Sequence, residues 1–195
     1  MINIKDIQKN ANVTFQKNLR YFEENHISVY QKLVDFKSLL GTGTPSRYSL
    51  EYVDGSFDLF NIKSGQYFYK NNLDKYNKII KEETSFSSTK NTIHTIAFEI
   101  FDKEYLKNNK IKRDTQKSIN VISKIIKRIG IKKEKKFEKI HKFIFLGTLL
   151  GTHLRKVHKK LDAKNYLIVE PDLEIFYLSL FITKYYSFAV DAIKI

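Results

Sequence analysis

The sequence predicts an α+β N-terminal domain, made of helices plus an antiparallel meander over residues 1–135, followed by an incomplete Rossmann-like α/β unit over residues 140–195. Three observations predict this division. Apolar residues recur at helical spacing over residues 4–40, and apolar and polar residues alternate around tight turns over residues 47–69. A pattern of strand, glycine turn, helix and strand occupies residues 142–172.

The N-terminal segment carries the helical pattern. Apolar residues lie three or four positions apart from Ile4 to Leu40, which is the spacing of one face of a helix. The pattern is interrupted around Asn25 and ends at the turn from Gly41 to Pro45. We therefore expect two helices that meet close to Asn25.

A three-stranded antiparallel meander is expected next. Residues 48–52 and 57–61 each alternate between apolar and polar side chains, and Asp54-Gly55 lies between them. This dipeptide is a strong hairpin signal, because glycine accepts the positive φ that a tight turn requires. The turn at residues 63–65 leads into the third strand around Tyr67.

The middle of the chain has weaker signals. A short amphipathic helix is expected over residues 71–86, a strand or a helix over residues 91–101, and a helix over residues 114–129. Residues 124–142 are strongly basic. This stretch either binds an anionic partner or is a solvated helix face and domain linker, and the second explanation is the simpler one.

Composition limits the class of protein. The chain has 195 residues, of which 42% are hydrophobic, so it can bury a core and is not a disordered chain. Its formal net charge of +14 attracts anions such as nucleic acid, anionic lipid or phosphorylated substrates. The lysine-rich composition of an AT-rich genome explains the same charge. We expect no nucleic-acid partner.

The compartment is expected to be the cytoplasm. The chain contains no cysteine, so it has no disulfide and no thiolate metal site. The first ten residues lack the apolar segment of a signal peptide, and no apolar run approaches the roughly 18 residues of a membrane helix. We therefore expect a cytoplasmic protein with no membrane span.

Residues 142–172 carry the functional prediction. Two apolar strands, residues 143–147 and 166–170, are expected to be buried on both faces, as parallel strands usually are. In nucleotide-binding folds, glycines between strand and helix let the backbone approach phosphate, and an acid after the second strand binds ribose hydroxyls. The candidate nucleotide-binding residues are Gly147, Thr148, Gly151, Thr152 and Glu170.

The spacing of this motif leaves two explanations open. The glycines form G-x-x-x-G rather than the usual G-x-G-x-x-G, so a strand–helix–strand unit without a ligand explains the motif about as well. Glu170 lies 23 residues after Gly147, close to the distance expected of a ribose-binding acid. This distance favours a ligand.

No catalytic residue and no metal site are predicted. His153 and His158 are five residues apart, which is the wrong spacing for a pair of ligands on one helix face. His153 is expected to be a surface or capping residue. Asp172 and Glu174 are as suited to capping the next helix as to binding a ligand.

Several segments resemble those of one protein family. The segments "LGTLLGTHL" and "LIVEPDLEIFYLSLF" resemble the start of the central, sialyltransferase-like domain of the motility accessory factors (Maf), the flagellin glycosyltransferases of polar-flagellated bacteria. The segments "FQKNLRYFEENH", "YSLEYVDGSFDLFNI" and "GQYFY" are similar to the N-terminal domain of the same family. The resemblance covers nearly the whole chain.

The resemblance implies a function. Maf proteins are thought to transfer pseudaminic or legionaminic acid from a CMP-activated donor to Ser or Thr of flagellin in the cytoplasm. Flagellin and the nucleotide sugar would be the partners, and no cofactor would be permanently bound. Family members are several hundred residues long, so we expect this chain to be a truncated form that lacks most of the catalytic domain and has no transferase activity alone.

Two other functions remain open from the sequence. The chain could be a non-catalytic module that binds flagellin or another partner, or another Rossmann-like nucleotide enzyme such as a pterin diphosphokinase or a methyltransferase. Two parallel strands do not make a stable doubly wound sheet without neighbours. Self-association through the exposed α/β unit is therefore a further expectation.

Overall fold

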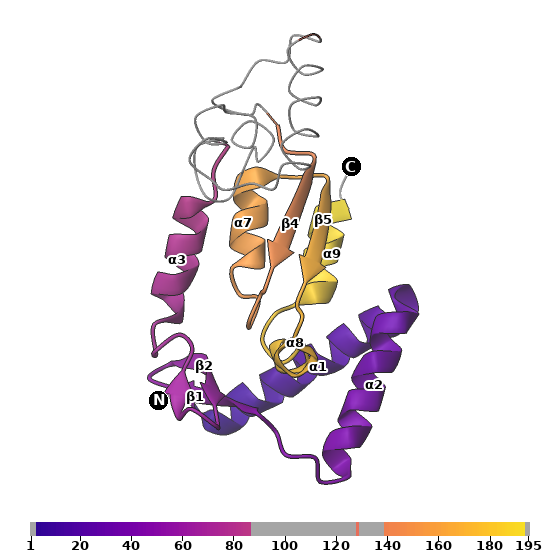
Figure 1. Ribbon diagram of the computed structural model, residues 1–195, viewed down its shortest axis with the longest axis vertical. Coiled ribbons are helices and arrows are strands. Elements are labelled where there is room, and N and C mark those ends of the chain that lie inside the picture. The colour runs from indigo at the N-terminus through magenta and orange to yellow at the C-terminus, as the bar shows by residue number, and fades with distance from the viewer. Residues whose placement is uncertain (1–2, 87–127, 129–138, 194–195) are drawn as a thin grey trace, which may run out of the picture. The chain divides into compact units, whose positions relative to one another are not determined.

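The computed structural model describes residues 3–86, 128 and 139–193. The elements expected over residues 91–101 and 114–129, and most of the basic stretch, lie outside the described residues. The described elements are α1 (Ile4–Asn25), α2 (Ile27–Gly41), β1 (Tyr48–Val53), β2 (Ser56–Asn61), β3 (Gln66–Tyr67), α3 (Leu73–Glu83), β4 (Lys142–Leu146), α7 (Leu154–Leu161), β5 (Asn165–Val169), α8 (Leu173–Ser179) and α9 (Tyr185–Ile193) (Figure 1).

The two expected N-terminal helices are confirmed. Asn3 caps α1 by accepting a hydrogen bond from the Lys5 amide at 3.0 Å. The break between α1 and α2 is at His26, whose backbone leaves the helical region (φ −145°, ψ 62°) while its N–H still bonds the Phe22 carbonyl. The interrupted apolar pattern at Asn25 therefore marks a real helix boundary.

The antiparallel meander is also confirmed, in the order β1-β2-β3. The β1–β2 register pairs Tyr48 with Asn61 and Val53 with Ser56, so Asp54-Gly55 forms a two-residue turn. Both turn residues have positive φ, 50° and 85°. These are the left-handed conformations of a type I′ hairpin turn, which suits the twist of the strands.

A second, parallel sheet consists of β4 and β5, joined through α7. The apolar residues Leu154, Val157 and Leu161 form the buried face of α7, as their spacing indicates. Two helices, α8 and α9, follow β5, because Thr183 and its neighbours form a turn between them. The protein is thus mixed helix and sheet, in agreement with the α+β class.

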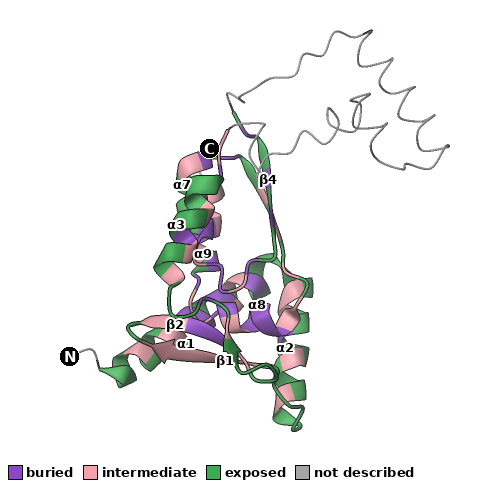
Figure 2. Cartoon of the chain, turned by 60° about the vertical axis from the view of Figure 1, so that its left-hand side comes forward, coloured by how far each residue is buried: buried purple, intermediate pink, exposed green. Residues whose placement is uncertain are grey.

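The expectation that β4 and β5 are buried on both faces is wrong. Along β4, Phe143 and Phe145 are buried, whereas Ile144 and Leu146 are exposed. The reason is the placement of the helices. Tyr166 of β5 stacks on Phe145, and both His158 of α7 and Phe188 of α9 contact Tyr166, so the two helices lie on the face of these rings. In Figure 2 exposed residues accordingly run along β4, and buried residues gather where α1 and α8 meet the meander.

The described residues before Glu82 and after Ile140 form one compact unit. Its contacts include α1 with α9, α2 with α8, and α8 with β1. Residues on both sides of the boundary expected at 135–140 thus share one core. The core cluster unites the meander, the glycine turn and α8 through Leu59, Tyr69, Leu150 and Ile175.

Candidate functional site

The turn from Gly147 to Gly151 joins β4 to α7, and three of its residues have a left-handed backbone conformation. Gly147, Leu149 and Gly151 have φ values of 69°, 49° and 68°. Glycine adopts this region without steric cost, whereas Leu149 does so at a cost of about 1 kcal/mol or more. Contacts outside the turn must therefore hold its shape.

Glu170 supplies the main contact. Its Oε2 accepts hydrogen bonds from the amides of Thr148 at 2.6 Å and Leu149 at 3.0 Å, and the Thr148 hydroxyl lies 3.4 Å away. Its Oε1 accepts from the Asp172 amide at 3.2 Å. Two successive amides around a positive-φ residue form an anion-binding concavity. In this structure, the anion in that concavity is the Glu170 carboxylate.

The other amides of the turn are bonded within the protein as well. Gly147 N–H donates to the Val169 carbonyl at 2.8 Å, Leu150 N–H to the Tyr69 hydroxyl at 2.9 Å, and Gly151 N–H to the Thr148 carbonyl at 2.8 Å. Burial raises the pKa of Tyr69 well above its usual range, which keeps its hydroxyl neutral. All five amides from Gly147 to Gly151 thus have acceptors.

The end of the turn is packed tightly against α9. A Cβ atom on Gly151 would lie 2.9 Å from the Tyr185 hydroxyl and 3.2 Å from the Thr183 hydroxyl. The same Thr183 hydroxyl donates to the Leu150 carbonyl. Burial raises the pKa of Tyr185 to about 12. Gly151 is therefore required by close packing, whereas Gly147 faces open space.

The start of α7 is buried against α3. The Thr152 hydroxyl donates to Asn77 Oδ1 at 2.9 Å, and the His153 ring contacts Tyr76 and Phe145. His153 is only 4% exposed, which corrects the expectation of a surface residue, and it makes no capping hydrogen bond. Its buried Nδ1 has no partner among the described residues. Burial lowers the pKa of this imidazole to about 4, so it is neutral at physiological pH.

The structure thus brings the five predicted site residues to one place, the carboxyl ends of β4 and β5. Glu170 touches the turn directly, and Thr152 faces α3 instead. Sequence reasoning missed Tyr69 and Asn77, which bond the turn from distant elements. Asn77 is a buried polar residue on a helix, but nothing in the local pattern distinguishes it from a surface asparagine.

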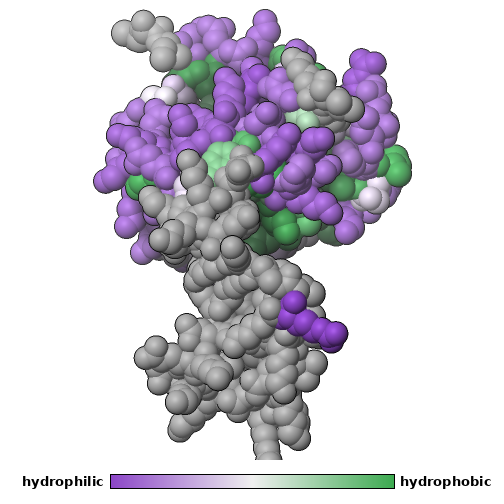
Figure 3. Space-filling model, turned by 90° about the horizontal axis from the view of Figure 1, so that it is seen from above, coloured by the Kyte–Doolittle hydropathy of each residue, from purple (hydrophilic) through white to green (hydrophobic). Residues whose placement is uncertain are grey.

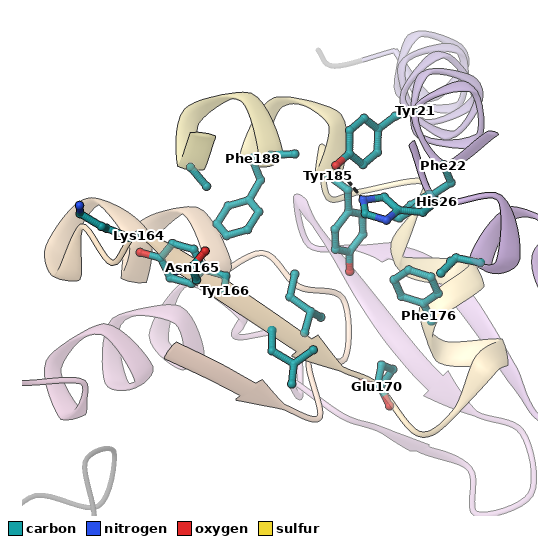
Figure 4. Close-up of a pocket in the computed structure, with 15 residues that line it drawn as sticks. Tyr21, Phe22, His26, Lys164, Asn165, Tyr166, Glu170, Phe176, Tyr185 and Phe188 are labelled. Carbon is teal, nitrogen blue, oxygen red and sulfur yellow. Dashed lines mark hydrogen bonds between the residues drawn. The ribbon is translucent and has the colours of Figure 1, made fainter. Parts of the chain in front are cut away.

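A cavity of about 540 Å³ lies beside Glu170. Figure 4 shows β5 along one side, with Lys164 and Glu170 towards its two ends, and aromatic rings of α1, α8 and α9 opposite. Across the cavity, the Tyr21 hydroxyl and His26 Nε2 lie 3.2 Å apart. The walls are mainly apolar and aromatic, and the polar groups are few.

Asp172 and Glu174 have structural partners. Asp172 caps α8 by accepting from the amides of Glu174 and Ile175, and Arg47 forms ion pairs with both acids. The buried Glu174 carboxylate also accepts from the Arg47 and Tyr48 amides. These two acids therefore fasten α8 to β1.

Two features are absent from the part of the chain that the structure describes. No cluster of three or more His, Cys, Asp or Glu side chains that could hold a metal ion occurs among them. Within the same part of the chain, no helix is both long and apolar enough to cross a membrane. On the face shown in Figure 3 hydrophilic residues dominate, with hydrophobic residues in smaller patches between them.

The fold and site define an α+β protein with a strand–turn–helix–strand unit, β4–α7–β5, whose turn is held by Glu170, the acid that directly follows β5. A family model described as "Glycosyltransferase Maf N-terminal domain" matches residues 14–192. The chain therefore belongs to the Maf glycosyltransferase N-terminal domain family, as its resemblance to Maf proteins indicates.

A solved structure supports this assignment at the level of the fold. The chain is similar to the structure of a Maf glycosyltransferase from Magnetospirillum magneticum AMB-1, with a TM-score of 0.56 and 16% sequence identity. The similarity covers 94% of this chain and 26% of that chain. This protein thus spans about a quarter of the solved relative. A search of the curated proteins found no match.

Proposed function

We propose that this chain is the N-terminal part of a Maf-like flagellin glycosyltransferase. The reaction would transfer a nonulosonic acid, pseudaminic or legionaminic acid, from a CMP-activated donor to Ser or Thr of flagellin in the cytoplasm. The family match over residues 14–192 carries the proposal. The strand–turn–helix–strand unit, interpreted as Rossmann-like, supports a nucleotide-binding role.

The proposed donor site is the carboxyl end of β4 and β5. Gly147 and Glu170 are the proposed contacts with the nucleotide, because Gly147 is exposed and Glu170 is only partly buried. Thr148, Gly151 and Thr152 would act by shaping the turn, since their polar groups already bond Glu170, Thr148 and Asn77. A donor phosphate at the turn would have to replace the Glu170 carboxylate.

Nucleotide titration of the isotope-labelled chain tests this proposal. CMP should shift or protect the amides of Gly147 and Glu170, while ATP and S-adenosylmethionine should not. The amide of Gly55, in the distant hairpin turn, provides an internal control. An equal response to all three nucleotides would favour another Rossmann-like enzyme, and no response to any of them would contradict the donor site.

Transfer itself is measured by the mass of flagellin after incubation with the chain and a CMP-nonulosonic acid. We expect no gain in mass, because the chain corresponds to about a quarter of the solved glycosyltransferase. A full rate of transfer by this chain alone would refute the expectation that catalysis needs the remaining parts of a Maf protein.

One observation favours a second function, a non-catalytic module that binds flagellin. All five amides of the glycine turn already have acceptors within the protein, which leaves none of them free for a phosphate. Tight binding of flagellin by the full chain in the absence of any nucleotide would support this module. Binding that requires CMP would support the enzyme.

A further inference from the structure

A second pocket lies between α1, the β1–β2 hairpin and the start of α9. Its volume is about 520 Å³, and it shares no residue with the proposed donor site or with the 540 Å³ cavity. Lys17 of α1, Tyr52 of β1 and Phe57 of β2 line it, together with Lys184 and Tyr186. The pocket therefore combines two cationic side chains with aromatic rings.

The buried side chain of Asn18 fixes the position of the two lysines. Its amide group donates to the carbonyls of Leu180 and Thr183 at 2.7 Å each, and its Oδ1 accepts from the Tyr186 amide at 3.3 Å. These bonds hold the segment that contains Lys184 against the part of α1 that contains Lys17. In addition, Lys17 Nζ lies 5.8 Å from the centre of the Tyr186 ring. The core thus brings two lysines that are remote in sequence to one pocket.

The positive charge of this pocket is not balanced within the described part of the chain. None of the described Asp and Glu side chains lines the pocket, and neither Lys17 nor Lys184 forms an ion pair with a described residue. Lys184 also directly precedes α9, and its carbonyl accepts from the Phe188 amide at 2.9 Å. A cation is disfavoured at this end of a helix, where the helix dipole is positive. An anion in the pocket would offset all of these charges.

Aromatic rings form the apolar part of the pocket. Tyr52 and Phe57 contact each other edge to face, with their ring centres 5.1 Å apart. Phe181, which also lines the pocket, stacks on the buried Phe15 at 4.2 Å. Tyr52, Phe57 and Phe181 are half-buried, so part of each ring is accessible. Pockets of this size that combine apolar surface with a few polar groups are typical of small-molecule sites.

We propose that this pocket binds a small organic anion, a single ring that carries a carboxylate or a phosphate. Lys17 and Lys184 hold the anionic group, and the rings of Tyr52 and Phe57 pack against the ring of the ligand. The proposal goes beyond the glycosyltransferase function and uses none of the residues of the donor site, so each of the two can fail without the other.

Titration of the isotope-labelled chain with benzoate tests the proposal, with amide chemical shifts as the readout. Benzamide is the matched neutral probe, because it has the same ring and nearly the same shape without the charge. We expect benzoate to shift the amides of Lys17 and Tyr186 with a Kd on the order of 1 mM. Benzamide should bind about tenfold more weakly. The amide of Gly43, in the turn after α2, is the internal control and should not shift.

Phenyl phosphate, used in a parallel titration, distinguishes the two anionic groups. Tighter binding of phenyl phosphate than of benzoate would assign the pocket to a phosphorylated ligand, because a phosphate carries more charge and more acceptor oxygens than a carboxylate. Tighter binding of benzoate would assign it to a carboxylic acid. Either result supports an anion site.

Variants that remove one charge separate a site from general attraction to a basic chain. Lys17→Gln and Lys184→Gln should each weaken benzoate binding about threefold, and the double variant about tenfold, because exposed charge pairs contribute modestly. Lys164→Gln is the matched control, since Lys164 is equally an exposed lysine but lines the 540 Å³ cavity. It should leave benzoate binding unchanged.

Three results would overturn the proposal. Equal binding of benzoate and benzamide would show that the pocket selects the ring and not the charge. Equal weakening by all three single variants would show that only the overall charge of the chain attracts the anion. Unshifted amides of Lys17 and Tyr186 at about 10 mM of either anionic probe, roughly ten times the expected Kd, would exclude the site.

Discussion

Replacement of Glu170 by alanine tests whether this acid holds the glycine turn. The change removes the acceptor of the Thr148 and Leu149 amides, which lie 2.6 and 3.0 Å from Oε2. Hydrogen bonds to a charged group contribute about 1.5–3 kcal/mol each. Glu170 is partly exposed, so water can replace some of this interaction. We therefore expect the free energy of unfolding of the variant to be about 2–3 kcal/mol lower than that of the natural protein.

The measurement is urea unfolding followed by circular dichroism. For a domain of this size, with a slope near 2 kcal/mol per molar urea, the midpoint should fall by about 1 M. Glu170→Gln is the matched control, because its amide oxygen can still accept hydrogen bonds from the amides of the turn. Its free energy of unfolding should be only about 1 kcal/mol lower than that of the natural protein. If Glu170→Ala lowers the free energy of unfolding by less than about 0.5 kcal/mol, which is the size of effect that a surface substitution has, the role assigned to the carboxylate is refuted.

The remaining predictions concern the packing around the turn and the core. Gly151→Ala should lower the free energy of unfolding by about 3 kcal/mol or more, because its Cβ would lie 2.9 Å from the Tyr185 hydroxyl. Gly147 has a similar positive φ but faces open space, so Gly147→Ala should lower the free energy of unfolding by only about 1 kcal/mol. Equal losses in the two unfolding curves would argue against close packing at Gly151. The folded-state pKa of His153 lies at about 4, below its ordinary 6.5, so stability is full above pH 6.5 and should fall by about 3 kcal/mol as the pH drops to 4. His153→Leu should lack this part of the pH profile, and an unchanged profile would rule out His153 as its source. Asn18→Ala should cost about 3 kcal/mol in thermal or urea unfolding, because the buried side chain donates to two backbone carbonyls at 2.7 Å each; a loss under about 1 kcal/mol would show that these bonds contribute little.

The elements that sequence predicts well are those whose signals are local. The period of apolar residues locates α1 and α2, and Asp54-Gly55 locates the β1–β2 turn, because both depend on neighbouring residues only. Burial of β4 is harder to predict. An apolar strand can be covered on one face or two, and the answer depends on helices that lie elsewhere in the chain.

The candidate site shows the same limit. The sequence singles out Gly147, Gly151 and Glu170 as one group, and the structure does place them together. Their mutual contacts are not predictable, since a carboxylate that binds ribose and one that binds the turn give the same sequence pattern. Buried polar residues such as Asn18 and Asp58 also escape prediction, because a polar side chain indicates burial only through partners that are remote in sequence.

The compact unit is built from two stretches of chain, up to Glu82 and from Ile140 onward, and this has a consequence for biosynthesis. Asn18 of α1 donates hydrogen bonds to the carbonyls of Leu180 and Thr183. Because these two residues are synthesised much later, α1 leaves the ribosome long before its acceptors exist. At about 5–20 residues per second, the delay is on the order of ten seconds or more. During this interval the nascent helices expose Phe15 and Phe22, and we expect chaperones to shield them.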